Sequence, residues 1–131
     1  MCGAVRFEVE GDIVGDDLCH CSICRKYAAV GYAGAQIKRT QATVHGMDRV
    51  TWYATSEKAK RGFCSTCGAH LFWEPGPQRD WLGVYLGAFD EPTGAKIKLH
   101  IFVDNKGDYY DIADGLPAFG TIPPKGWHPP E

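Results

Sequence analysis

The sequence predicts a single all-β domain, and three observations support this. The chain has 131 residues, enough for one compact domain with a core, and 44% of them are hydrophobic. No window shows the long 3.6-residue period of an amphipathic helix. Short apolar runs follow one another with turn residues between them, which is typical of an all-β domain. We expect one domain over residues 1–120 and a proline-rich, extended tail over residues 121–131.

The predicted strands follow one another along the chain. The first covers residues 4–10 and alternates strictly, with Val5, Phe7 and Val9 on one face. Among the later segments, residues 50–53 are all β-branched or aromatic, which suits a pleated surface. The later segments cover residues 30–37, 43–45, 50–54, 60–64, 69–73, 81–89 and 97–103. Turn residues between elements lie at Asp16 and Asp17, 46–48, 75–77 and 104–107. Residues 25–29 are expected to form one helical turn.

Charge and hydropathy exclude two kinds of partner. Fourteen basic and sixteen acidic residues give a formal net charge of −2. A protein held mainly by nucleic-acid phosphates would carry a basic surplus, so we expect no nucleic-acid partner. No apolar run approaches the length of a membrane span, and no basic-then-apolar leader opens the chain. We therefore expect no membrane partner.

The six cysteines have metal-binding spacing. Cys19, Cys21 and Cys24 form Cys-x-Cys-x-x-Cys, Cys64 and Cys67 form Cys-x-x-Cys, and Cys2 is the sixth. A disulfide framework is less economical, because Cys19 and Cys21 are too close to bridge each other comfortably. A redox-active pair is less expected without a βαβ pattern. Thiolates that bind zinc in a reducing cytoplasm explain the spacings better.

Cys19, Cys21 and Cys24 can converge on one zinc ion. In an extended segment, residues two apart share a face, so Cys19 and Cys21 point the same way and His20 points away. Cys24 joins them after a tight turn. Zinc is usually tetrahedral, so three thiolates leave one position open, as in catalytic sites. His20 is expected to lie on the surface or beside the ligands rather than to be a ligand. Arg25 and Lys26 follow Cys24 directly. They either offset the negative charge of a zinc ion with three thiolates or form part of a solvated turn.

Cys64 and Cys67 form a knuckle that could bind a second zinc ion. Gly68 allows the positive φ with which backbone N–H groups turn toward sulfur. Cys2 supplies a third thiol, but a structural zinc ion takes four ligands. His70 could complete the set, although a histidine on a strand is more often a packed residue.

Three motifs occur in a fixed order along the chain. They are Cys2-Gly3-Ala4-Val5-Arg6-Phe7, Cys19-His20-Cys21-Ser22-Ile23-Cys24-Arg25 and Phe63-Cys64-Ser65-Thr66-Cys67-Gly68, with further segments at 100–103 and 114–117. In these motifs the chain resembles the glutathione-dependent formaldehyde-activating enzyme family, which shares its domain with centromere protein V. The resemblance implies a β-tent fold of coiled antiparallel sheets.

The resemblance also implies one or two zinc ions per chain. A structural ion would lie on Cys2, Cys64 and Cys67, and a catalytic-type ion on the Cys-x-Cys-x-x-Cys motif. The family pattern has one more cysteine two positions before Cys2, which is ahead of Met1. Either the chain start is truncated, or another ligand completes the structural site.

The implied activity is the addition of glutathione to formaldehyde, giving S-hydroxymethylglutathione, or the reverse carbon–sulfur lyase reaction. Cys19, Cys21 and Cys24 would be the catalytic group, with glutathione as co-substrate. Zinc would either bind the glutathione sulfur or polarise the aldehyde oxygen. Basic residues next to the cysteines are candidates for the glutathione carboxylates: Arg25, Lys26, Lys60 and Arg61. Two alternatives stay open, namely a zinc-stabilised interaction module without turnover and another small-molecule enzyme on the same scaffold.

Overall fold

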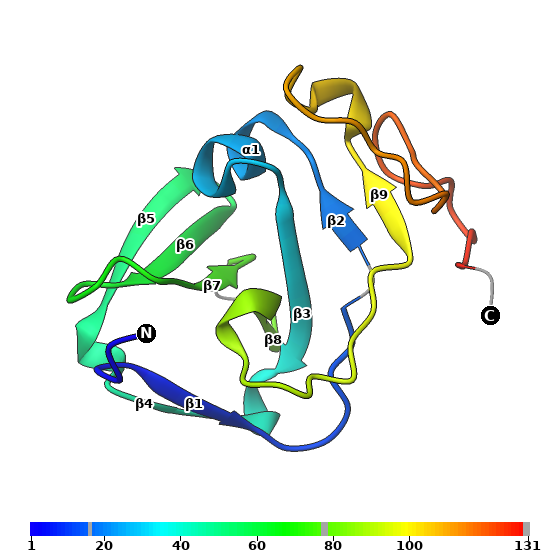
Figure 1. Cartoon of the computed structure of the whole chain (residues 1–131). Coiled ribbons are helices and arrows are strands. Elements are labelled where there is room, and N and C mark those ends of the chain that lie inside the picture. The colour runs from blue at the N-terminus through cyan, green and yellow to red at the C-terminus, as the bar shows by residue number, and fades with distance from the viewer. Residues whose placement is uncertain (16, 77–78, 130–131) are drawn as a thin grey trace. The chain divides into compact units, whose positions relative to one another are not determined.

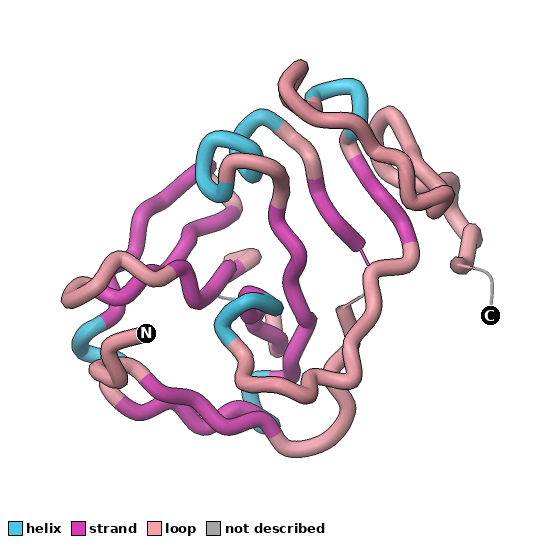
Figure 2. Tube along the Cα trace, in the orientation of Figure 1, coloured by secondary structure: helices cyan, strands magenta, loops and turns pink. Residues whose placement is uncertain are grey.

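The computed structural model describes residues 1–15, 17–76 and 79–129 (Figure 1, Figure 2). This part of the chain is mainly β, as predicted, and contains nine strands, one α-helix and four 3-10 turns. Asp16 and Pro77, which belong to two expected turns, lie outside the described residues, as do the last two residues of the expected tail. None of the described helices has the length and apolar character needed to cross a membrane.

The chain divides into two compact units. The first comprises residues 1–14 and 35–94, and the second comprises residues 15–34 and 95–131. Strand β3 (Tyr32–Lys38) contributes its first three residues to the second unit and the rest to the first. The domain boundary at residue 120 and the β-tent arrangement stay predictions.

Antiparallel strands build the first unit. They are β1 (Arg6–Val9), β4 (Ala42–His45), β5 (Val50–Ser56), β6 (Ala59–Cys64), β7 (His70–Glu74) and β8 (Trp81–Tyr85). β1 pairs with β4, and Phe7 lies opposite Val44. β5, β6, β7 and β8 are neighbours in a second sheet, and β3 lies beside β8. Two 3-10 turns connect strands of this unit, η1 (Arg39–Gln41) and η2 (Met47–Arg49), and a third, η3 (Leu86–Ala88), follows β8.

The core of the first unit forms where these strands turn apolar faces toward one another. Phe72, Ile37 and Val84 are each no more than 1% exposed. The ring of Phe7 stands edge-on to that of Phe72, with 5.8 Å between centroids, and to that of Phe89 at 5.0 Å. The other alternate residues of β1 are exposed, so the alternation predicted for this strand is confirmed.

The second unit is built around one short strand. Its elements are β2 (Asp17–Cys19), α1 (Ser22–Ala28), the start of β3, β9 (Leu99–Ile101) and the 3-10 turn η4 (Val103–Asn105). β2 pairs antiparallel with β3 and parallel with β9, where Leu18 lies opposite His100. On the other edge of β9, the N–H of His100 donates to the carbonyl of Pro117 at 2.8 Å. The parallel pair departs from the purely antiparallel sheets that the family resemblance implied.

The helix begins earlier than predicted. α1 starts at Ser22 rather than at Arg25, because the residue before it caps the first turn. The Sγ atom of Cys21 accepts a hydrogen bond from the N–H of Cys24 at 3.4 Å. The helix ends at Ala28, and its C-cap residue, Ala29, has a positive φ of 68°.

Two strands and the tail also differ from the prediction. The strand expected over 81–89 ends at Tyr85, because residues 86–88 form η3. The strand expected over 97–103 is reduced to β9, since the next residue has a left-handed φ of 57°. The tail is not fully extended: the N–H of Trp127 donates to the carbonyl of Pro124, and its ring lies 4.9 Å from that of Phe119.

We expect Phe72→Ala to lower the free energy of unfolding by about 3–5 kcal/mol, because it leaves a cavity in a closed core. Tyr53→Ala is the control, since this ring is 66% exposed, and should change the same quantity by about 0.5 kcal/mol or less. Urea denaturation of both variants measures the difference. Equal losses in the two variants would contradict the assignment of Phe72 to the core.

Candidate metal centre

Three cysteines of the second unit lie close enough to share one metal ion. The Sγ atoms of Cys19, Cys21 and Cys24, here called thiol group 1, all lie within 4.8 Å of one another. Sulfurs on one tetrahedral zinc ion stand about 3.8 Å apart, given Zn–S bonds of about 2.3 Å. Small side-chain adjustments would therefore bring all three onto one ion. The donor set fits zinc and leaves one tetrahedral position for another atom.

The strand and the helix of the second unit position thiol group 1. Cys19 ends β2, Cys21 is the N-cap of α1, and Cys24 is buried in the first helical turn. The interaction with Cys24, followed by burial, raises the pKa of the Cys19 thiol. Without metal this thiol stays protonated at neutral pH, so binding of a metal ion releases its proton.

Cys2, Cys64 and Cys67 form thiol group 2, in the first unit. The Sγ atoms of Cys2 and Cys64 are 3.7 Å apart, close to the separation on one zinc ion. Gly68 has the predicted positive φ, 74°, and its N–H donates to the carbonyl of Cys64 at 2.8 Å. The N–H of Ala69, followed by the interactions with Cys2, lowers the pKa of Cys67 to about 7. This set also fits zinc.

His70 does not join thiol group 2 in the described structure, although the sequence left that possibility open. It begins β7, and its ring packs against that of Tyr85 with 5.7 Å between centroids. Burial, and then the positive charge of Arg61, lowers the pKa of His70. The packing role considered for a strand histidine therefore describes this residue better.

The four basic candidates for glutathione carboxylates have different surroundings. The Nε of Arg25 donates to a backbone carbonyl of η4 at 3.2 Å. Lys26 is exposed on α1. In the first unit, Lys60 forms an ion pair with Glu74 at 3.0 Å, and Arg61 is buried in β6. Sequence proximity to cysteines was the only support for Lys60 and Arg61, whereas Arg25 and Lys26 lie on the helix that carries Cys24.

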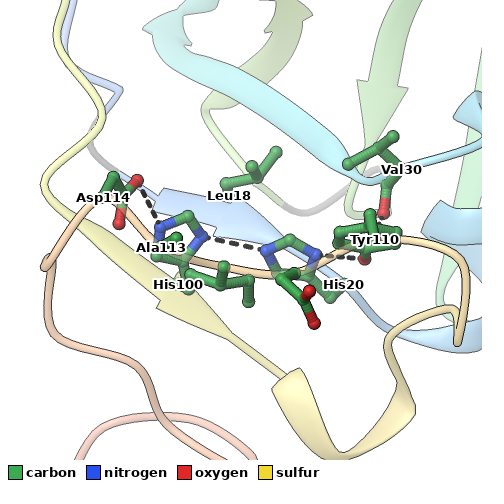
Figure 3. Close-up of a pocket in the computed structure, with 9 residues that line it drawn as sticks. Leu18, His20, Val30, His100, Tyr110, Ala113 and Asp114 are labelled. Atoms are coloured by element: carbon green, nitrogen blue, oxygen red, sulfur yellow. Dashed lines mark hydrogen bonds and ion pairs between the residues drawn. The ribbon is translucent and has the colours of Figure 1, made fainter.

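A row of hydrogen-bonded side chains also lies in the second unit (Figure 3). Asp114 Oδ2 is 2.9 Å from His100 Nε2, and His100 Nδ1 is 2.9 Å from His20 Nε2. His20 Nδ1 is 2.6 Å from the hydroxyl of Tyr110, which donates to the carbonyl of Val30 at 2.9 Å. Here these four side chains, Asp114, His100, His20 and Tyr110, are called the side-chain row. His20 is only 1% exposed, so it is not a surface residue.

The side-chain row has more contacts than hydrogens when both imidazoles are neutral. An ionised Asp114 and the Val30 carbonyl only accept, and Tyr110 offers one hydrogen. Each neutral imidazole offers one more, which gives three hydrogens for four contacts. Burial, followed by the electrostatic interaction with His100, lowers the pKa of His20.

Sequence reasoning missed the side-chain row because distant residues compose it. His20 is 80 positions from His100 and 90 positions from Tyr110. His100 and Asp114 lie in two segments that contributed to the family resemblance, so a signal was present for them. Tyr110 lies in an irregular segment with no pattern that distinguishes it from Tyr109.

The side-chain row lines a pocket of about 360 Å³ in the second unit (Figure 3). Leu18 and His20 face this pocket from β2 and its continuation, together with the apolar side chains of Val30 and Ile112. Residues two apart in an extended segment share a face, so Cys19 leaves the backbone on the opposite side. The pocket and thiol group 1 therefore lie on opposite sides of this segment.

Comparisons with known proteins agree with the motifs. Residues 1–105 match the sequence model of the family described as "Glutathione-dependent formaldehyde-activating enzyme". A Halomonas elongata protein named for the same family is 30% identical over 122 residues, which cover 85% of this chain and 76% of that protein. An uncharacterized lyase of Schizosaccharomyces pombe is 25% identical over 119 residues, covering 91% and 86% of the two chains. The crystal structure of a Rhodobacter sphaeroides protein has a TM-score of 0.56 at 27% identity and covers 69% of this chain and 84% of that one.

Asp114 should contribute stability that depends on pH. The N–H of Leu116, followed by His100, lowers the pKa of Asp114. This stabilisation is complete above the unfolded-state pKa of about 3.9 and is lost as the pH falls through the lower folded-state pKa. We expect Asp114→Asn to lower the melting temperature at pH 7, and the difference from the wild type to shrink toward pH 3. A difference that stays constant over this range would contradict the ionised contact.

Proposed function

Because the chain belongs to the glutathione-dependent formaldehyde-activating enzyme family, we propose that it catalyses the reversible addition of glutathione to formaldehyde. A C–S bond forms between the glutathione sulfur and the aldehyde carbon, and the thiol proton passes to the aldehyde oxygen. The product is S-hydroxymethylglutathione. In the reverse direction the same C–S bond breaks, which is a carbon–sulfur lyase reaction. The proximity of three sulfurs in thiol group 1 is the observation that carries this proposal.

We assign thiol group 1 to a zinc ion of the catalytic type. When bound there, zinc would favour the thiolate form of a glutathione sulfur in its fourth position, and the thiolate is the nucleophile. Cys24 is buried, whereas Cys19 and Cys21 are partly exposed, so a substrate can approach from the side of these two residues. The three sulfurs come from different parts of the strand–helix connection: Cys19 ends β2, Cys21 caps α1 and Cys24 lies within α1.

Glutathione carries two carboxylates, and α1 offers two cations near thiol group 1. Lys26 is exposed on the helix that carries Cys24, so its long side chain is accessible to an anion from solution. Arg25 already donates through Nε to η4, and this contact directs its guanidinium group. We therefore propose Lys26 and Arg25 as the residues that contact glutathione carboxylates.

Thiol group 2 is proposed to hold a structural zinc ion. Its members join the start of the chain to the knuckle after β6, and Cys2 and Cys64 are 62 positions apart. A metal ion that joins such distant residues contributes its binding free energy to folding. All six cysteines are free thiols, which fits a reducing compartment such as the cytoplasm.

The adduct also forms without an enzyme, so the test must measure a rate rather than an end point. NMR exchange spectroscopy follows the transfer of formaldehyde between its free and glutathione-bound forms. We expect the zinc-loaded chain to raise this rate in proportion to its concentration, and a chelator to return it to the uncatalysed value. A chain that holds zinc on thiol group 1 without any acceleration would contradict the proposal and favour a zinc-stabilised interaction module.

We expect Cys21→Ser to abolish the acceleration, because it removes one thiolate of thiol group 1. The same change should lower the melting temperature less than Cys67→Ser does, since thiol group 1 ties only a local segment whereas thiol group 2 joins distant ones. Exchange spectroscopy and thermal unfolding of the two zinc-loaded variants give both comparisons. Full activity in Cys21→Ser would remove thiol group 1 from the mechanism.

A further inference from the structure

Tyr110 connects the two segments that carry thiol group 1. Its hydroxyl lies 2.6 Å from Nδ1 of His20, which stands between Cys19 and Cys21. The same hydroxyl donates to the carbonyl of Val30 at 2.9 Å, two positions after the end of α1. One side chain therefore reaches both the strand segment and the far end of the helix.

The imidazole of His20 is held on every side. Its Nε2 and Nδ1 atoms both have partners, its side chain is buried, and its backbone N–H donates to the carbonyl of Ile101 at 2.9 Å. A ring that cannot turn restrains the Cα–Cβ direction of its residue, and so limits the rotation of the peptide planes on either side. Those planes determine the directions of the flanking side chains, Cys19 and Cys21. The distance between the sulfurs of Cys19 and Cys21 therefore depends on the contacts that the His20 ring makes on the opposite side of the backbone.

The far end of the row is anchored by a charge. His100 is 4% exposed on β9, and its Nε2 atom lies 2.9 Å from Asp114. A carboxylate that accepts this hydrogen bond orients the ring of His100, which in turn orients that of His20. Hydrogen-bond partners of metal-ligating side chains commonly change metal affinity about 10- to 100-fold when removed, and we take the lower end of this range for partners that act through the ligand backbone.

We propose that the side-chain row positions thiol group 1 for metal binding, and that Tyr110 is the residue that ties its strand to its helix. This inference rests on one part of the proposed function, namely that thiol group 1 binds a metal ion. No member of the row is a ligand; each acts through the backbone of the residues that carry the sulfurs. Tyr110 and Asp114 are accordingly positioning residues.

Loss of the Tyr110 hydroxyl should disturb both segments at once. In Tyr110→Phe, Nδ1 of His20 loses the buried hydroxyl beside it, and the carbonyl of Val30 loses the hydroxyl donor and keeps only its contact with His20. The loss of a buried partner of this kind drives local rearrangement toward water or another partner. The distances among the three sulfurs then vary more, and the metal ion is held less tightly.

Cadmium-113 NMR of the full chain tests this proposal, because each thiol group gives its own signal in one molecule. Cys21→Ser assigns the signal of thiol group 1. Cadmium and zinc affinities are then measured by chelator competition for the wild type, Tyr110→Phe and Asp114→Ala. Asp111→Asn is the matched control, since Asp111 lines the same pocket and has no hydrogen bond to either imidazole in the described structure.

We expect Tyr110→Phe and Asp114→Ala to shift the signal of thiol group 1 and to weaken its metal binding about tenfold or more. The signal of thiol group 2 should stay in place, which separates positioning from general loss of structure. The double variant should lose less than the product of the two single effects, because both changes act through the same imidazoles. Asp111→Asn should match the wild type.

Three outcomes would overturn the proposal. If Tyr110→Phe and Asp114→Ala both keep the wild-type cadmium shift and metal affinity of thiol group 1, the side-chain row has no positioning role, and the proposed function is unaffected. Equal changes in both signals would show a general effect on folding, which also contradicts it. A wild-type chain with no signal from thiol group 1 would overturn the metal-based function and this inference together, so the two failures are distinguishable.

Discussion

The parallel register of β2 against β9 determines where the chemistry-bearing residues of the second unit lie. It places Leu18 opposite His100 and lets the N–H of His20 donate to Ile101. Side chains alternate along a strand, so a slip of one residue would turn His100 toward the face of Cys19 and separate the two imidazoles. On its other edge, β9 is joined by backbone hydrogen bonds to residues 117–119. The thiols and the imidazoles thus depend on one pairing.

The two thiol groups differ in how far apart their three cysteines lie in the sequence. Thiol group 1 draws on six consecutive positions, so its loop-closure cost is small and a short strand–helix connection suffices. Thiol group 2 joins residues separated by most of the first unit, and it requires the sheet to be formed. A metal ion on the local group could therefore exchange a ligand without reorganisation of the core.

The sequence predicted those parts of the structure that depend on local pattern. The alternation of β1, the positive φ of Gly68 and both cysteine groups follow from spacing and from the conformational range of single residues. β2 was missed because three residues carry too short a pattern, and its partner β9 lies 80 positions away. The start of α1 was misplaced because a thiol is an uncommon helix cap. Tyr110 could not be found, since only the folded chain brings its hydroxyl to His20.

The sulfur of Cys21 has two structural roles: it caps α1, and it belongs to thiol group 1. Serine is a preferred capping residue, and its hydroxyl can accept the same hydrogen bond while offering no thiolate. The helix thus tolerates a replacement that removes one sulfur from thiol group 1. During evolution, a descendant could lose this sulfur by one such replacement and keep its backbone. Among relatives of this chain, shared shape is therefore a poor guide to shared catalysis, and the residue at this cap is a better one.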